Sequence, residues 1–149
     1  MNDAVEYSFD AARLDVDAIH RYLTNDAYWC LGIPRATIEK AIAHSLCIVA
    51  YRGGVLIGFA RLVTDRATFA YLCDVFVLAP ERGQGIATRM VRALLDHPEA
   101  QGLRRTLLFT RDMHALYARL GFDAIARPER GMEIVRPDIY QSSAASTSN

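Results

Sequence analysis

The sequence predicts a single α/β (α+β) domain in which helices flank a mixed, mostly antiparallel sheet. An apolar, β-branched run at residues 75–79 is followed by a glycine-bearing turn and an amphipathic helix, which together form a strand–turn–helix unit. Two earlier apolar runs flank a glycine pair, which is typical of a β-hairpin. At 149 residues and 52% hydrophobic content, the chain can bury one core.

The strand–turn–helix unit spans residues 74–96. Pro80 ends the strand, because proline has no N–H to give to a neighbouring strand. The three-and-four spacing of the apolar residues that follow predicts an amphipathic helix over residues 86–95, with Pro98 just past its end. The apolar face consists of Ile86, Ala87, Met90, Val91, Leu94 and Leu95.

The turn of this unit has the features of a phosphate-binding site. Gly83 and Gly85 carry no side chains, so backbone N–H groups there can approach a bulky ligand closely. The first N–H groups of a helix are unpaired and carry the positive end of its dipole. Arg82 adds a positive charge beside them. An ordinary glycine loop before a helix remains the alternative for this turn taken alone.

The residues before this unit predict two helices and four strands. Asp15 or Asp17 can cap a first helix that runs to about residue 23, and Pro34 suits the first turn of a second helix at 34–44. The strands are expected at residues 5–9, 47–51, 55–60 with an extension to 63, and 68–77, with a hairpin turn at Gly53 and Gly54.

After residue 96 the pattern predicts further strands and one helix. A strand at 106–109 should run parallel to the strand at 68–77, because a helix connects the two. Asp112 can cap a helix that ends at Gly121. Strands are expected at 122–126 and 132–135. The domain is expected to span residues 1–140, and the Ser- and Ala-rich residues 141–149 to be disordered.

Charge and cysteine content exclude several classes of function. The 17 basic and 17 acidic residues give no net charge, and no clustered basic face predicts nucleic-acid binding. No apolar run approaches membrane-spanning length, and the N-terminus lacks the pattern of a signal peptide. Cys30, Cys47 and Cys73 have neither disulfide nor zinc spacing. A cytoplasmic protein without a bound metal is the expectation.

Two motifs resemble those of the GCN5-related N-acetyltransferase (GNAT) superfamily. One is Arg82-x-x-Gly85-x-Ala87 after an apolar strand, which resembles the loop that binds the pyrophosphate of acetyl-CoA. The other is Leu116-Tyr117-x-x-Leu120-Gly121-Phe122. The resemblance covers roughly residues 49–122, and the order of the predicted elements agrees with it.

The resemblance implies a fold and a cosubstrate. In the family, a central pair of parallel strands splays apart, and the pantetheine arm of acetyl-CoA enters the gap. Here the pair would be residues 68–77 and 106–109. The implied cofactor contacts are Val75, Phe76 and Val77 along the strand, and Arg82, Gly83, Gln84, Gly85, Ile86, Ala87 and Thr88 around the pyrophosphate. Thr110 stands where many members have a cofactor-binding asparagine.

The candidate catalytic residues are Tyr117, which the resemblance implies, and Asp74, which is chosen for its position in the strand. A phenol at position 117 can protonate the leaving sulfur, and a core tyrosine is the alternative. Some members use a strand glutamate as base, but Tyr71 stands there. Asp74 is the nearest carboxylate; it either forms a structural pair with an arginine such as Arg61 or acts as base through a water.

The expected activity is the direct transfer of acetyl from acetyl-CoA to the primary amine of a small molecule in a ternary complex. Candidate acceptor contacts are Tyr28, Trp29, Arg61, Phe69 and Tyr71. Dimers are common in the family, so a homodimer is one assembly to expect. The second hypothesis is an acyl-CoA-binding sensor or interaction module that has kept the cofactor site and lost turnover.

Overall fold

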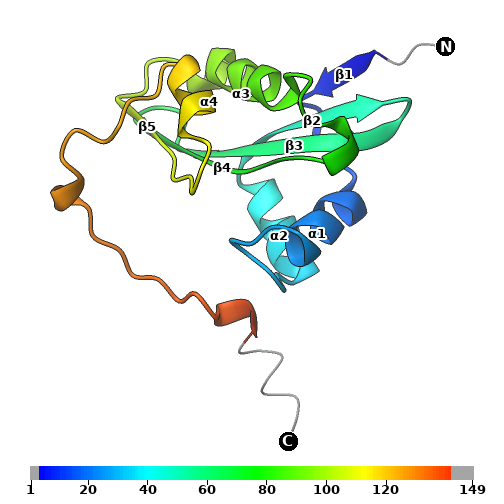
Figure 1. Cartoon of the computed structure of the whole chain (residues 1–149), viewed down its shortest axis with the longest axis horizontal. Helices are drawn as coiled ribbons and strands as arrows, with labels where there is room; N and C mark the ends of the chain where they lie inside the picture. Colours follow the sequence, from blue (N-terminus) through cyan, green and yellow to red (C-terminus); the bar gives the residue numbers. More distant parts are fainter. Residues whose placement is uncertain (1–3, 142–149) are drawn as a thin grey trace, which may run out of the picture.

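The computed structural model describes residues 4–141 and shows a twisted sheet with helices on both faces (Figure 1). The five strands lie side by side in chain order. Neighbours are antiparallel from β1 to β4, whereas β4 and β5 are parallel. This confirms the predicted mixed, mostly antiparallel sheet. The strands are β1 (Val5–Ser8), β2 (Leu46–Arg52), β3 (Val55–Thr64), β4 (Phe69–Val77) and β5 (Arg105–Leu107).

The hairpin between β2 and β3 forms where the glycine pair predicts it. Arg52 pairs with Val55, and the two residues between them are Gly53 and Gly54, with φ angles of +57° and +78°. A two-residue turn with positive φ at both positions matches the right-handed twist of the flanking strands. Glycine adopts these angles without steric cost.

The helices lie in two layers, one on each face of the sheet (Figure 1). The helices α1 (Val16–Asn25) and α2 (Arg35–Ala43) cover one face. The helices α3 (Ile86–Asp96) and α4 (His114–Arg119) cover the other. Asp15 caps α1 through a hydrogen bond that its carboxylate accepts from the Ala18 N–H. Short 3-10 turns lie at Ala11–Arg13, Ala79–Glu81, Pro98–Ala100 and Pro128–Arg130.

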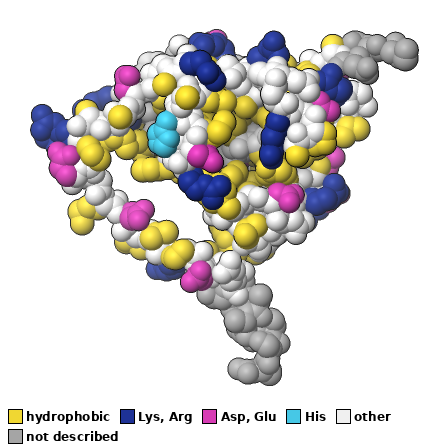
Figure 2. Space-filling model, viewed as in Figure 1, with side chains coloured by type: hydrophobic (Ala, Val, Ile, Leu, Met, Phe, Trp, Pro, Cys, Tyr) yellow, Lys and Arg dark blue, Asp and Glu magenta, His cyan; other side chains and the backbone are white. Residues whose placement is uncertain are grey.

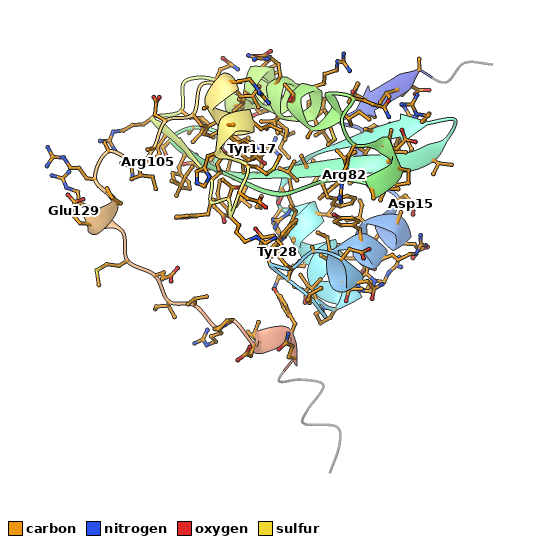
Figure 3. The ribbon with its side chains drawn as sticks, viewed as in Figure 1. Asp15, Tyr28, Arg82, Arg105, Tyr117 and Glu129 are labelled. Carbon is orange, nitrogen blue, oxygen red and sulfur yellow. The ribbon has the colours of Figure 1, made fainter. Side chains whose placement is uncertain are left out.

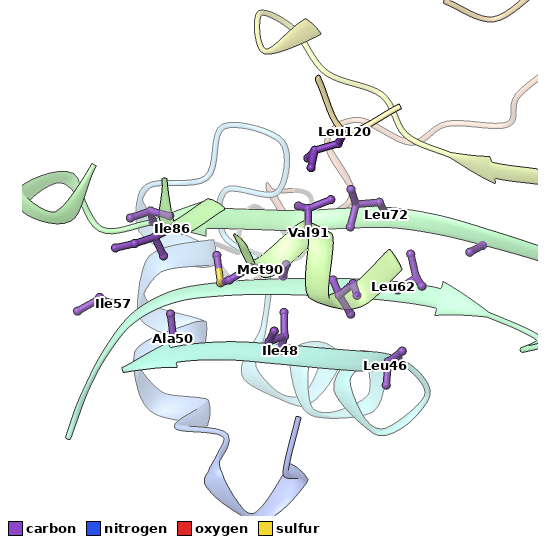
Figure 4. Packing of buried hydrophobic residues seen from close by; sticks show 14 residues of the cluster. Leu46, Ile48, Ala50, Ile57, Leu62, Leu72, Ile86, Met90, Val91 and Leu120 are labelled. Atoms are coloured by element: carbon purple, nitrogen blue, oxygen red, sulfur yellow. The ribbon is translucent and has the colours of Figure 1, made fainter. Parts of the chain in front are cut away.

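Two apolar layers hold the helices to the sheet. On one face, Met90, Val91 and Leu94 of α3 are fully buried against β2, β3 and β4 (Figure 4). The helix can approach closely because β3 has Gly58 beneath it, where an added Cβ would lie 3.0 Å from Cε of Met90. The layer on the opposite face includes Ile19, Leu23, Ile38 and Phe59. The predicted core of α3 is therefore confirmed.

The two strands predicted after α4 are wrong. Among residues 122–138 the structure contains no strand, and the 3-10 turn at Pro128–Arg130 is its only helical element. Met132 and Ile134 are 99% and 92% exposed. Alternating apolar residues become a strand only where a neighbouring edge supplies hydrogen bonds and a face to cover, and this segment lies against none. Consequently β5 is the edge strand of the described sheet.

Smaller differences concern element ends. The last strand pair ends at Leu107 rather than at residue 109, because β4 and β5 separate there. The N-cap residue of α4 is Met113 and no side chain caps this helix, so the expected cap at Asp112 is wrong. The Thr110 hydroxyl accepts the Met113 N–H at 3.0 Å. The other predicted strands and helices agree within a few residues. Residues 142–149 of the predicted disordered tail lie outside the described residues.

Candidate functional site

A cavity opens where β4 and β5 stop pairing. The parallel ladder comprises only three residue pairs, the last being Tyr71 with Leu107. Beyond it β4 continues to Val77, whereas the chain after β5 turns away towards α4. The resulting cavity has a volume of about 360 Å³. It is lined by Tyr28, Trp29, Tyr71, Leu72, Cys73, Asp74, Val75, Leu108, Phe109, Thr110, Arg111, Asp112, Met113 and Tyr117.

Asp74 lies on a β-bulge in the wall of this cavity. The β3–β4 register shifts between Phe59 and Arg61, and Asp74 has a φ of +54°, which is rare for a residue other than glycine. The bulge turns the carboxylate to receive two partners. One oxygen accepts the indole N–H of Trp29 at 2.8 Å, and the other accepts two N–H groups of Arg61 at 2.8 and 3.0 Å.

Arg61 completes an ion pair that is largely withdrawn from solvent. Its side chain is 16% exposed and that of Asp74 is 9% exposed. Burial alone would lower the pKa of the Arg61 guanidinium, but Asp74 and Cys73 hold that pKa above its ordinary value, so the side chain stays charged. Arg61 also donates to the Ser45 hydroxyl at 3.1 Å. Of the two alternatives for Asp74, the structure shows the pair with Arg61.

Figure 3 labels Tyr117 on α4. It lines the same cavity as Asp74. Burial raises the pKa of its phenol, and the nearby Tyr28 raises it further. The hydroxyl forms no hydrogen bond with another residue of the described chain, 4–141. A neutral phenol with an uncommitted O–H can donate a proton or a hydrogen bond to a group that enters the cavity.

An aromatic wall faces the mouth of the cavity. The rings of Tyr28 and Trp29 meet edge to face, with centroids 5.1 Å apart, and Tyr71 lies 6.3 Å from Phe109. The guanidinium of Arg111 lies over the Tyr28 ring at 3.9 Å. These rings come from the loop after α1, from β4 and from the chain after β5, so only the tertiary fold brings them together.

The loop before α3 has the unpaired donors that the sequence predicts. Gly85 is the N-cap in the left-handed conformation, with a φ of +78°, and no side chain caps the helix. The first helical hydrogen bond is donated by Arg89 to the Gly85 carbonyl, which leaves the N–H groups of Ile86, Ala87 and Thr88 without helical partners. Gly83 also has a positive φ, +82°, and Gln84 lies between the two glycines.

Two arginines flank this loop. Arg82 is the residue named by the sequence pattern, and it donates to the Val77 carbonyl at 2.9 Å and to the Tyr22 hydroxyl at 3.0 Å. Arg89 lies on the first turn of α3 and donates to the Gln84 carbonyl at 3.1 Å. The sequence analysis did not assign Arg89 to this loop. Arg89 lies four residues after the capping glycine, and this spacing is the sequence feature that indicates a side chain directed back to the loop.

The cofactor contacts predicted on β4 differ in how accessible their side chains are to a ligand. Phe76 and Val77 are buried, and Phe76 stacks on Tyr22 at 4.0 Å, so only their backbone groups are available to a ligand. The Val77 carbonyl already accepts from Arg82. Val75 lines the cavity, and so does Thr110, whose hydroxyl oxygen accepts a hydrogen bond at the start of α4.

Several other residues lie differently from the expectation. Arg61 is not among the residues that line the cavity, because its guanidinium is held by Asp74 and Ser45. Phe69 pairs with Arg105 at the opposite end of β4. Sequence reasoning did not assign Arg111 and Asp112 to the cavity, although Asp112 provides its second carboxylate. Polar residues directly after a strand were the available signal.

Two features are absent from residues 4–141. No group of three or more His, Cys, Asp or Glu side chains in that range could hold a metal ion. No helix there is both long and apolar enough to span a bilayer.

Comparison with known proteins gives concordant matches. Residues 16–122 match the model of the acetyltransferase (GNAT) family. A candidate acetyltransferase of Gibberella zeae is 34% identical, over 76% of each chain. The crystal structure of a candidate GNAT acetyltransferase from Xanthomonas campestris has a TM-score of 0.89 and 45% identity, covering 92% of this chain and 96% of its own.

A more distant structure agrees in fold. It is the crystal structure of a candidate acetyltransferase from Clostridium acetobutylicum with acetyl-CoA, which has a TM-score of 0.64 and 17% identity, over 89% of this chain and 96% of its own.

Proposed function

Because the chain belongs to the GNAT family of acetyltransferases, we propose that it transfers the acetyl group of acetyl-CoA to a primary amine of a small molecule. The observation that carries the proposal is the cavity at the open ends of β4 and β5, which has an uncommitted phenol, Tyr117, and a carboxylate, Asp74, in its lining. A thioester and an amine that meet there would have a proton donor and a negative charge beside them.

The loop before α3 would hold the pyrophosphate of acetyl-CoA. The free N–H groups of Ile86, Ala87 and Thr88 and the bare backbone at Gly83 and Gly85 offer hydrogen bonds to phosphate oxygens. The exposed guanidinium groups of Arg82 and Arg89 add positive charge, and the exposed Gln84 lies between the two glycines. This loop follows β4 directly, so a ligand held there can extend along the strand into the cavity.

The acyl arm would then lie beside β4. Past the last β4–β5 pair, no residue of 4–141 pairs with β4 on its β5 side, and an extended chain with amide groups can bond to such an edge. Val75 lines the cavity at this point, and the backbone of Phe76 continues towards the loop. Thr110 faces the cavity from the other side, and its hydroxyl hydrogen can be donated to the ligand.

The reaction would be a direct displacement. The amine nitrogen attacks the thioester carbon, a C–N bond forms, and the C–S bond breaks. The departing sulfur takes the proton of the Tyr117 hydroxyl, and the amine gives its proton to a base. We assign that base to Asp74 acting through a water, since the carboxylate lines the cavity while Arg61 and Trp29 hold it in a fixed orientation.

The acceptor would bind between aromatic side chains. Tyr28, Trp29 and Tyr71 line the cavity, and the cationic Arg111 lies over Tyr28. Aromatic walls favour an apolar or cationic amine, and an arginine favours an acceptor that also carries a carboxylate. A cavity of about 360 Å³ has the size of a small-molecule site.

A catalytically weak acyl-CoA-binding module is the second candidate. It is favoured by the state of Asp74, both of whose oxygens are already engaged, and by Thr110, which stands in place of the family's frequent asparagine.

Calorimetry with acetyl-CoA, combined with a thiol-release assay on a panel of primary amines, separates the two candidates. Transfer predicts binding and amine-dependent thiol release; binding without release for every amine supports the module, and absence of binding removes both.

A further inference from the structure

The loop before α3 has little packing of its own to fix its shape. Beyond its chain neighbours, an added Cβ at Gly83 would meet no atom within 4 Å, and one at Gly85 would meet only the Arg89 guanidinium. Gln84, between the two glycines, is exposed. The N–H groups of residues 83–88 donate to no backbone carbonyl within the described range 4–141. Because glycine loses the most freedom on ordering, such a loop stays fixed only if other elements hold it.

Arg52 holds this loop from the sheet. It is the last residue of β2, where it pairs with Val5 of β1 and with Val55 of β3. Its Nε donates to Glu81 Oε2 at 3.1 Å, and its Nη2 donates to Gln84 Oε1 at 2.8 Å. The Gln84 amide donates to the same Glu81 oxygen at 3.4 Å. Three side chains, from β2, from the turn after β4 and from the loop, therefore form one closed network.

This network is partly withdrawn from solvent. The side chains of Arg52 and Glu81 are 24% and 21% exposed, whereas those of the ion pair Arg35–Glu39 on α2 are 47% and 53% exposed. Water and salt screen exposed ion pairs, so such pairs contribute little to holding a structure in place. The half-buried position of Arg52 and Glu81 reduces that screening, and the two side chains can therefore fix the loop to the sheet.

Gln84 is held at its backbone as well as at its side chain. Its carbonyl accepts from Nη1 of Arg89 at 3.1 Å, while Arg52 and Glu81 bind its side-chain amide. In a trans peptide the C=O and the N–H of one plane point in opposite directions. Because Arg89 fixes the direction of the Gln84 carbonyl, the N–H of Gly85 is directed the opposite way. The donors of the loop thus have set directions before a ligand arrives.

Positive charge is not gathered in one patch on the face that Figure 2 shows, where basic side chains are scattered among acidic and apolar ones. The charge of Arg52 itself is offset by Glu81. The contribution of Arg52 to an anion site is therefore the arrangement of the loop and not added positive charge. An arranged site binds more tightly, because the ligand does not have to order the loop.

We propose that Arg52 is a positioning residue for acetyl-CoA: through Glu81 and Gln84 it fixes the loop before α3 in the conformation that receives the pyrophosphate. Arg52 precedes these two residues by 29 and 32 positions in the sequence. Its role in acetyl-CoA binding rests on the proposed function, whereas its hold on the loop does not. Loss of Arg52 leaves every backbone donor present but mobile, so the expected defect is weaker binding with unchanged chemistry.

The mobility of the ligand-free loop tests the proposal without acetyl-CoA. Amide nitrogen relaxation should give residues 83–85 order parameters of about 0.85 in the wild type, as for a rigid backbone. In Arg52→Met, which keeps an unbranched stem but no donors, they should fall below about 0.6 with an unchanged circular dichroism spectrum. Arg35→Met is the matched control, because Arg35 also binds two carboxylates, Asp17 and Glu39, but lies on α2. A loop that stays rigid in Arg52→Met, or is mobile in the wild type, overturns the proposal.

Calorimetry and kinetics with acetyl-CoA test the consequence for binding. Arg52→Met should bind acetyl-CoA about 10-fold more weakly and raise its KM by the same factor, with kcat at saturation unchanged. Added to Gln84→Met, the same change should weaken binding by less than about threefold, because its contact is already lost.

Losses of affinity that multiply in this double variant would show that Arg52 acts independently of Gln84, and they would overturn the proposal. A wild type that binds no acetyl-CoA removes the proposed function instead. The order parameters of residues 83–85 then still decide whether Arg52 holds the loop.

Discussion

The indole N–H of Trp29 and the carboxylate of Asp74, 45 residues apart in the chain, lie 2.8 Å from each other in the wall of the cavity. The loop after α1 is thereby tied to the bulge in β4. Because Arg61 holds the other carboxylate oxygen, the orientation of Asp74 is set by two elements at once. The wall that would face an acceptor is thus built around one ionised group.

Replacing Trp29 with Phe should loosen this connection. An aromatic ring remains but the donor is lost. Because Trp29 is 44% exposed, we expect a loss of about 1 kcal/mol in the free energy of unfolding, below the usual range for a hydrogen bond to a charged group. The acceptor KM should rise. Urea denaturation and steady-state kinetics measure the two effects. Tyr28→Phe is the matched control; if it has the same effects, the indole N–H is not their source.

Replacing Arg61 with Met should destabilise the fold strongly. Asp74 would remain 9% exposed without its counter-charge, and the removal of one partner from such a pair costs about 3–5 kcal/mol. The double variant Arg61→Met/Asp74→Asn should recover part of the loss, because Asn is neutral and tolerates a positive φ. Urea denaturation of the wild type, of Arg61→Met, of Asp74→Asn and of the double variant completes a double-mutant cycle. Strictly additive losses in the free energy of unfolding would contradict coupling between Arg61 and Asp74.

Replacing Tyr117 with Phe should lower kcat by about 100-fold, the size of a lost general acid, while the affinity for acetyl-CoA stays within about twofold. Burial raises the pKa of this phenol, so it stays protonated, and available as the acid, from neutral pH up to beyond its ordinary value. A thiol-release assay measures kcat, and calorimetry measures the affinity for acetyl-CoA. Unchanged turnover would show that Tyr117 is a core residue.

Replacing Gly85 with Val should weaken the binding of acetyl-CoA. A β-branched residue cannot readily hold the φ of +78° that aims the free N–H groups of α3, and its Cβ would lie 3.8 Å from the Arg89 guanidinium. Gly102→Val is the control, since Gly102 has a φ of +73° and precedes β5 at the end away from the cavity. Equal affinity losses in the two variants would indicate general strain instead of a lost phosphate site.

The cysteines should make the fold sensitive to alkali. Burial raises the pKa of Cys30, Cys47 and Cys73 from 9.0 to about 12. The neutral thiols are therefore favoured in the folded state. Their contribution to stability is complete below pH 9 and is lost as the pH rises towards 12, because the unfolded chain ionises first.

The free energy of unfolding should consequently fall between pH 9 and 10.5, and the fall should diminish in Cys47→Ala. At pH 8 a thiol reagent should label the native protein far more slowly than the unfolded chain, since the thiolate fraction is about 1000-fold smaller. Rapid labelling of the native protein would contradict the raised pKa of the three thiols.

Much of the fold could be predicted from local sequence. The spacing of Ile86, Met90 and Leu94, the glycine pair in the hairpin and Pro80 after β4 each act through neighbouring residues, so the elements between β1 and α4 were recoverable. The same holds for the loop before α3, where Gly83 and Gly85 set the backbone locally. Tyr117 was found because two short motifs resemble those of a known family.

Tertiary structure alone decided the rest. Residues 132–135 have the sequence of a strand, yet strand formation requires hydrogen bonds from a separate edge, and the chain carries these residues away from that edge. Asp74 has either a structural or a catalytic environment depending on what stands opposite it, and only the register of β3 with β4 brings Arg61 there. The sequence by itself determined which residues prefer helix, strand or turn, whereas the charge partners and the uncovered faces depended on contacts between distant residues.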